Sequence, residues 1–320
     1  MELKVDIPGM WIFLAAGAYL LLAINGVADK FLLTKSVKHP VAYAFYVGIT
    51  GPLTFLLSLF GLLGTWLGWS FLSTEFSFQL LSPGNLVVAI IGGACFPLAL
   101  YFSYKAIQQT SISRILPIQG GLVPIFTLIL AYFILAERLS PVQIAAFLFL
   151  VAGAVLIAFK KVHGHWHALA FGNAIIASLL FAISLTLQKY IFTNVNFASG
   201  LMWTRLGFFA ASASFLISRK SRGYIFKAPK ETTSGNKFVY LAARISGGAA
   251  GFLQNYAIKL GSVSLVNALQ GTQYIFLLGI ASVLSVKFPK ILKEKITIRI
   301  MVQKIAAIVL ISTGLLILVL

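Results

Sequence analysis

Ten stretches of about twenty or more mostly apolar residues constrain this chain more than any other feature. A helix needs roughly 20 apolar residues to cross the hydrocarbon core of a bilayer. Of the 320 residues, 59% are hydrophobic and only 10% are charged, whereas a typical soluble domain carries about 25% charged residues. So few charges cannot cover a water-facing surface, which excludes an ordinary soluble enzyme. The expected spans are 9–33, 40–63, 84–108, 110–135, 140–160, 168–192, 197–218, 237–260, 262–287 and 300–320.

An internal repeat divides the chain into two halves. Residues 106–120 read AIQQTSISRILPIQG and residues 257–271 read AIKLGSVSLVNALQG, with six identities at a constant offset of 151 residues. A weaker echo links Asp29–Thr34 with Gln188–Thr193. These echoes place five spans in each half, and because five is odd the halves must have opposite orientations across the bilayer. We therefore expect an all-α membrane protein with ten transmembrane helices, arranged as two inverted five-helix repeats over residues 1–162 and 163–320.

Polar and ionisable residues inside the predicted spans are candidates for a substrate site, because charge at bilayer depth is costly. Inverted internal symmetry is typical of secondary transporters, whose substrate site lies near the midplane between the repeats. Residues three or four positions apart share one face of a helix, and this spacing groups the candidates. The expected substrate-binding residues are Tyr104, Lys105, Arg205, Arg244, Asn255, Asn267, Gln270 and Tyr274.

The charges inside the spans favour an anionic or zwitterionic substrate. Four cations lie at this depth, namely Lys105, Lys189, Arg205 and Arg244. Arginine binds carboxylate and phosphate through paired hydrogen bonds. Lysines near span ends can instead extend to the headgroups, and this alternative stays open for the two lysines.

A single acid, Asp29, falls within a predicted span and shares a helical face with Asn25 one turn earlier. We expect this pair to couple transport to protons or to serve as a counter-ion. The alternative is that Asp29 lies at the end of its span and is simply solvated.

Other chemistry has no visible site in the sequence. His163, His165 and His167 cluster in the linker between the halves with no acid or cysteine beside them, which indicates a loop rather than a metal site. The sequence contains neither a Walker phosphate-binding loop nor a recognisable catalytic triad. We therefore expect no catalytic residues, no metal and no cofactor. The expected partners are a small-molecule substrate, the lipid bilayer and coupling protons, with no nucleic acid.

One run of motifs in the first half is more specific than hydropathy. Within Leu116–Ser140 it contains Pro-Ile-Phe and then Ala-Glu-Arg-Leu-Ser, and Gly-Ala-Val-Leu-Ile follows at 153–157. This combination resembles the EamA domain of the drug/metabolite transporter superfamily. The resemblance covers the chain as two tandem domains and is sharpest in the first. It implies carrier activity and a ten-helix fold with cytoplasmic termini.

The distribution of basic residues predicts the opposite orientation. An excess of Lys and Arg in short loops marks the cytoplasmic side of a membrane. One set of loops holds only Lys4, Arg138 and Lys259, whereas the other holds most of the 25 Lys and Arg residues. By this rule the basic loops are cytoplasmic and both termini lie outside a cell or inner membrane.

Together these features predict a secondary transporter, with export as the expected direction, that moves a small polar metabolite by alternating access. An amino acid or an organic anion is the expected substrate. Drug-like cations and lipid-linked metabolites are alternative substrates. A lipid-modifying enzyme or a non-transporting scaffold would be a different class of protein. The enzyme would need a clustered acid–base or metal site, and the scaffold would typically carry a sizeable soluble domain.

Overall fold

The computed structural model describes residues 9–35, 39–110, 112–158, 168–227, 234–287 and 298–320, and within them it describes the side chains outside 27–35, 112–113, 234–240, 281–287 and 298–299. All regular elements of this part of the chain are helices, so the all-α prediction is confirmed. They are α1 (Met10–Lys35), α2 (Pro40–Gly48), η1 (Gly51–Leu57), α3 (Ser58–Leu67), α4 (Ser70–Glu75), α5 (Pro83–Gln109), α6 (Ile112–Ile134), α7 (Pro141–Ala158), α8 (Ala168–Asn194), α9 (Phe197–Ser214), η2 (Phe215–Ile217), α10 (Arg219–Lys227), α11 (Ser234–Leu260), α12 (Val263–Ala268), α13 (Gln270–Lys287) and α14 (Ile298–Val319).

Eight helical segments among the described residues are long and apolar enough to cross a membrane. They are Pro40–Leu67, Pro83–Gln109, Arg114–Ile134, Pro141–Ala158, Ala168–Asn194, Phe197–Ile217, Val263–Ile280 and Ile300–Val319. Each overlaps one of the predicted spans. The predicted spans 9–33 and 237–260 correspond to α1 and α11. The apolar stretch of α1 covers Met10–Gly26, and α11 is interrupted by polar residues.

Local sequence signals set several helix ends. Ser82 and Asn196 precede α5 and α9, and the side chain of each accepts a hydrogen bond from the backbone amide three residues later (3.4 and 2.9 Å). Such caps satisfy amide groups that the first turn of a helix leaves without a partner. The predicted ninth span is broken at Leu269, so that α12 and α13 are separate helices.

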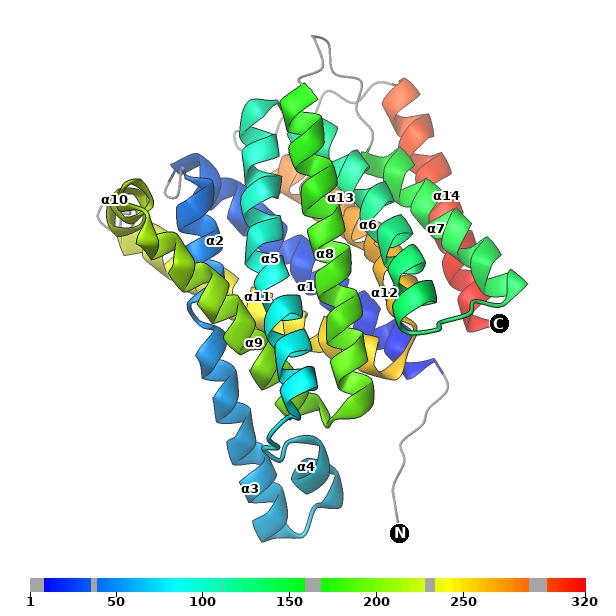
Figure 1. Ribbon diagram of the computed structural model, residues 1–320. Coiled ribbons are helices and arrows are strands. Elements are labelled where there is room, and N and C mark those ends of the chain that lie inside the picture. Colours follow the sequence, from blue (N-terminus) through cyan, green and yellow to red (C-terminus); the bar gives the residue numbers. More distant parts are fainter. Residues whose placement is uncertain (1–8, 36–38, 111, 159–167, 228–233, 288–297) are drawn as a thin grey trace.

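Helices that are distant in sequence pack along one another. Figure 1 shows the bundle, in which α5 lies along α8 and α9, and α6 also lies along α8. On the other side α1 lies along α11 and α13, while α7 lies along α14. The largest apolar core accordingly combines both halves of the sequence, with Tyr19 and Leu150 from the first and Phe197, Leu265 and Ile311 from the second.

Two glycines bring α5 and α9 into backbone contact. A Cβ atom on Gly207 would overlap the carbonyl oxygen of Ile90, and a Cβ atom on Gly93 would overlap the carbonyl oxygen of Thr204. Small residues allow membrane helices to approach this closely. The crossing therefore fixes the position of Arg205, the residue that follows Thr204.

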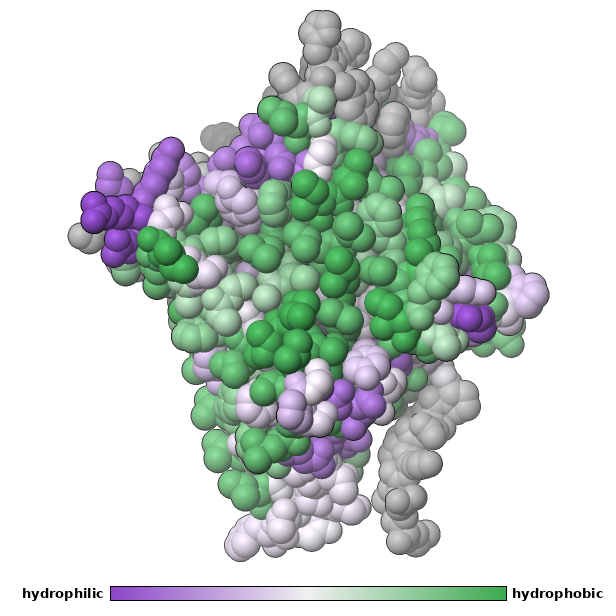
Figure 2. Space-filling view, in the orientation of Figure 1, coloured by the Kyte–Doolittle hydropathy of each residue, from purple (hydrophilic) through white to green (hydrophobic). Residues whose placement is uncertain are grey.

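Apolar side chains cover the sides of the bundle. Figure 2 shows a broad hydrophobic band, with hydrophilic residues gathered toward its upper and lower ends. Large apolar side chains such as Phe13, Phe133 and Leu148 are exposed on the surface. In water such a surface would be unfavourable, whereas it matches the hydrocarbon of a bilayer. The α3–α4 segment projects from the lower end and exposes Trp66 and Trp69 there.

Candidate functional site

Polar positions of α11 recur every three or four residues and meet helices from both halves of the chain. A Cβ atom on Gly247 would lie 3.0 Å from Nδ2 of Asn25 in α1, and one on Gly251 would lie 3.2 Å from Nη2 of Arg205 in α9. The two glycines thus leave room for polar side chains of neighbouring helices. The face of α11 that carries Gly247 and Gly251 is called the wall of the candidate site below.

Arg205 places a guanidinium group in the middle of α9. Its guanidinium carbon lies 4.2 Å from the centre of the Phe208 ring, and Nη2 points toward Gly251. Among the described residues, its side chain forms no hydrogen bond and no ion pair. A desolvated cation–π contact contributes about 2 kcal/mol, while a charge at the bilayer centre costs about 3 kcal/mol or more. The N–H donors of the guanidinium therefore have no acceptor among the described residues.

Arg244 lies one turn before Gly247 in α11 and joins this helix to α2. Its Nη2 donates a hydrogen bond to the hydroxyl of Tyr43 (2.9 Å), and its guanidinium carbon lies 5.0 Å from the centre of the same ring. The ring of Tyr43 in turn contacts that of Tyr104, with centres 4.4 Å apart. The structure thus brings together the predicted residues Arg244 and Tyr104, and Tyr43 is the group between them.

Tyr19 of α1 links α11 to α12. Its hydroxyl donates a hydrogen bond to the carbonyl oxygen of Val266 (2.8 Å) and accepts one from Nε2 of Gln254 (3.4 Å). Sequence reasoning missed both Tyr19 and Tyr43, because a tyrosine among apolar residues resembles a packing residue. The available signal was the hydroxyl, since a buried tyrosine hydroxyl usually needs a partner.

Asn255 and Tyr274 are predicted residues that carry buried polar atoms without a hydrogen-bond partner in the described part of the chain. Asn255 donates its amide to the carbonyl oxygen of Gly251 (2.7 Å), but its Oδ1 has no hydrogen-bond partner in the described residues. The hydroxyl of Tyr274, which lies against Gly120, likewise has no partner there. Unsatisfied buried polar atoms are uncommon in native structures. A ligand or a water molecule beside these two atoms would satisfy them.

Apart from Asn25, which faces Gly247, the remaining predicted residues are less directly connected to this wall. Asn267 donates to the carbonyl oxygen of Val263 within its own helix (3.0 Å), and Gln270 begins α13. Lys105 is partly buried, with Nζ 5.8 Å from the centre of the Tyr101 ring. Asn25 is buried against Gly247. The side chain of Asp29 and the three linker histidines lie outside the described residues.

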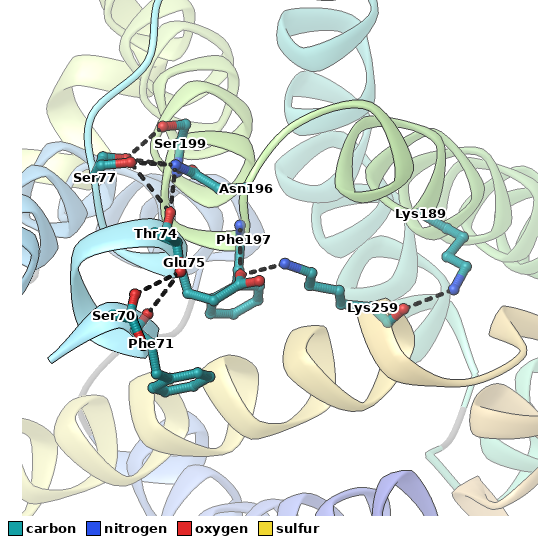
Figure 3. A network of polar contacts seen from close by, with 10 residues as sticks. All are labelled: Ser70, Phe71, Thr74, Glu75, Ser77, Lys189, Asn196, Phe197, Ser199 and Lys259. Atoms are coloured by element: carbon teal, nitrogen blue, oxygen red, sulfur yellow. Dashed lines mark hydrogen bonds and ion pairs between the residues drawn. The ribbon is translucent and has the colours of Figure 1, made fainter. Parts of the chain in front are cut away.

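A separate polar network lies at the lower end of the bundle (Figure 3). Lys189 of α8 donates hydrogen bonds to three carbonyl oxygens at the end of α11, those of Ile258 (2.8 Å), Lys259 (2.9 Å) and Gly261 (2.7 Å). Lys189 therefore binds the negative end of a helix dipole. The sequence had left open whether this lysine lines a cavity or extends to the headgroups, and the structure shows a third arrangement.

Two acids complete the network. Glu75 of α4 forms an ion pair with Lys259 and accepts a hydrogen bond from the backbone amide of Phe197 (3.2 Å). Glu137, from the Ala-Glu-Arg-Leu-Ser motif, accepts hydrogen bonds from the Ser262 hydroxyl (2.7 Å) and from the amide of Val263 (3.3 Å) at the start of α12.

Lys189 thus binds the carbonyl groups of the turn between α11 and α12, and Glu137 binds the amide group at the start of α12. A recess of ≈ 320 Å³ beside this turn is lined by Ile134, Leu135, Glu137, Lys189, Tyr190 and Thr193.

Comparisons with known proteins agree with this architecture. Among 28 matching solved chains, one described only as the crystal structure of a protein superposes with a TM-score of 0.65 and 18% identity, over 95% of this chain and 94% of its own. At that identity the likeness shows the fold alone. No curated protein sequence matches. Residues 9–159 match the model of the EamA-like transporter family. This first half of the chain is therefore an EamA-like domain of the drug/metabolite transporter superfamily.

Proposed function

We propose that this membrane transporter is a secondary carrier of a small anionic or zwitterionic metabolite, such as an amino acid or an organic anion, and that Arg205 binds the anionic group. The observation that carries the proposal is the Arg205 guanidinium, which lies mid-helix in α9 and makes no hydrogen bond or ion pair within the described part of the chain. A substrate carboxylate or phosphate would compensate this charge through paired hydrogen bonds. A drug-like cation would be repelled by it.

The unsatisfied side-chain atom of Asn255 favours a substrate that also carries hydrogen-bond donors. Asn255 Oδ1 accepts hydrogen bonds only, and it belongs to the same turn of α11 as Gly251, which faces Arg205. An ammonium or hydroxyl group of the substrate would satisfy it. The Tyr274 hydroxyl would donate a further hydrogen bond. Arg205, Asn255 and Tyr274 form the core of the proposed site, and Arg244 with Tyr104, Lys105, Asn267 and Gln270 are its proposed outer residues.

Helix bounds and packing support two repeats, over residues 1–162 and 163–320. The bounds of α5 (83 and 109) and of α11 (234 and 260) differ by 151 residues at both ends, the same offset as the sequence echo. The packing of the two halves also corresponds. In one group α8 lies along α5 and α6, and in the other α1 lies along α11 and α13. Ten helices in two inverted repeats would alternate access to a site between them.

Direction, coupling and orientation complete the proposal. We place the end that bears α10 in the cytoplasm, because the cations of α10 lie there, whereas Glu75 and Glu137, the acids with described side chains, lie at the opposite end. Export would then carry substrate from the α10 end to the α4 end. Asp29, next to Asn25 on α1, is the proposed proton-coupling residue.

Flux measurements in proteoliposomes test the role of Arg205. We expect the wild-type protein to transport labelled amino acids or organic anions, and we expect Arg205→Gln to reduce the rate at least tenfold. Arg205→Lys keeps the charge without the paired donors and should be intermediate. Arg138→Gln, which removes an exposed cation far from α9, is the control. Wild-type rates in Arg205→Gln would refute the assignment, and transport of organic cations alone would favour the alternative substrate class.

A further inference from the structure

The helix α10 differs from every other connection described in this chain, because it is short, strongly basic and attached sideways to the bundle. It holds Arg219, Lys220, Arg222 and Lys227 within nine residues, and these four residues are called the α10 basic surface below. All four are exposed. Figure 2 shows them as a hydrophilic projection at the edge of the hydrophobic band.

Contacts with α2 fix the orientation of α10. The side chain of Ile225 is fully buried beneath it and packs in a cluster with Ala42 and Phe45. The hydroxyl of Tyr46 donates a hydrogen bond to the carbonyl oxygen of Ile225 (2.9 Å). The ring of Tyr224 also stacks on the ring of His39, the residue just before α2, with ring centres 3.5 Å apart. One face of α10 therefore packs against the rest of the protein, and the basic face points outward.

The outward face combines positive charge with apolar side chains. Arg219, Arg222 and Phe226 are spaced by three and four residues and share one side of the helix. Phe226 is 60% exposed, and Ile217, just before α10, is 83% exposed. Exposed Phe and Ile side chains are unfavourable on a helix in water. Basic residues flanked by exposed Phe and Ile are typical of helices that lie in the headgroup layer.

The α10 basic surface has no internal counter-charge among the residues that the structure describes. None of its four side chains takes part in an ion pair or a hydrogen bond there. The acids with described side chains, Glu75 and Glu137, bind Lys259 and the start of α12 at the far end of the bundle. Within the described part of the chain, these charges are thus available to an external anion.

We propose that the α10 basic surface binds the anionic phospholipid headgroups of the bilayer, with Phe226 and Ile217 inserted at the boundary of the acyl chains. Arg219, Lys220 and Arg222 bind the phosphate groups of the lipid. The ligand is an acidic phospholipid rather than a soluble anion. This inference goes beyond the proposed transport activity and does not depend on the substrate.

The position of α10 links such binding to the candidate site. Tyr46, which holds α10, lies one turn of α2 from Tyr43, which accepts a hydrogen bond from Arg244. A lipid that immobilises α10 would therefore stabilise α2 and the site side of α11.

Thermal unfolding of the full-length protein in a neutral detergent tests the proposal without any transport assay. The probes are phosphatidylglycerol, phosphatidylcholine and inorganic phosphate, each added at equal concentration. A ligand that binds only the folded protein raises its unfolding temperature. We expect phosphatidylglycerol alone to do so. In Arg219→Gln/Lys220→Gln/Arg222→Gln its affinity should fall about a hundredfold, at roughly fivefold per cation.

Two control variants keep the result interpretable. Arg219→Lys/Arg222→Lys preserves the charge and should retain the increase, and Arg138→Gln removes a cation from the other end and should retain it as well. Equal stabilisation by phosphatidylcholine, equal stabilisation by inorganic phosphate, or an undiminished increase in the triple glutamine variant would each overturn the proposal. The single variant Arg222→Gln, with an expected fivefold weaker effect, replaces the triple variant if that protein does not fold.

Discussion

Replacing Lys189 by methionine tests a charged group that makes three hydrogen bonds to backbone carbonyl groups. The variant removes three hydrogen bonds of 2.7 to 2.9 Å between Nζ and the carbonyl oxygens that end α11. A hydrogen bond to a charged group contributes about 1.5 to 3 kcal/mol. Lys189 is only partly buried, so water will satisfy some of the freed carbonyl groups. We therefore take about 3 kcal/mol as the total loss, including the interaction with the helix dipole.

Thermal unfolding of the purified protein measures this loss. At about 2 °C per kcal/mol for a large domain, Lys189→Met should unfold about 6 °C below the wild type. Thr193→Ala is the matched control, because Thr193 lines the same recess and its side chain makes hydrogen bonds only within its own helix, to the Tyr190 carbonyl and from the Asn194 amide. The control should shift the unfolding temperature by less than about 2 °C. An unchanged unfolding temperature in Lys189→Met would refute the structural role of the lysine.

Three further predictions follow from single contacts. Gly207→Ala should destabilise the protein by about 2 kcal/mol or more, since the added Cβ overlaps a carbonyl oxygen of α5, and the control Gly172→Ala, which has open space around it, should unfold near the wild-type temperature. Glu137→Gln should cost about 1 kcal/mol in the same measurement by weakening the cap of α12. Tyr43→Phe keeps the ring but removes the acceptor for Arg244, so we expect about tenfold weaker apparent substrate affinity in flux assays, and an unaltered affinity would contradict a site role for that hydroxyl.

The proposed orientation has its own test. A reporter that is active only in the cytoplasm, fused to the C-terminus after Leu320, should be silent if the α10 end is cytoplasmic. A reporter that is active only outside the cytoplasm should give signal at the same position. The reverse pattern would show that the basic loops lie outside and that the termini follow the orientation implied by the family.

Hydropathy was sufficient to locate the eight described segments that are long and apolar enough to cross a membrane, because a span needs only length and apolar composition. The predicted range 237–260 falls within α11 even though Arg244 and Asn255 interrupt it. The same reasoning singled out Arg205, since one arginine in an apolar stretch is conspicuous without any knowledge of its neighbours. The break at Leu269 was missed, because no proline lies within the predicted range 262–287 to mark the end of a helix.

Long-range polar contacts were beyond the reach of the sequence. Lys189 and its three carbonyl partners are separated by 69 to 72 residues, and Glu137 lies 125 residues before Ser262. No local pattern indicates that such groups will meet. Tyr19 was missed for the same reason, because its partner Val266 is 247 residues away. These contacts follow from helix packing, and they become visible only once the fold is known.

Ligand-dependent thermal stabilisation of wild type and Arg205→Gln tests the central claim most directly. The purified proteins would be screened side by side against amino acids, organic acids, sugar phosphates and organic cations. Arg205 as the anion-binding group predicts that at least one carboxylate or phosphate compound raises the unfolding temperature of the wild type, and that the same compound has no effect on Arg205→Gln. Stabilisation of both proteins by that compound, or stabilisation of the wild type by cations alone, would contradict it.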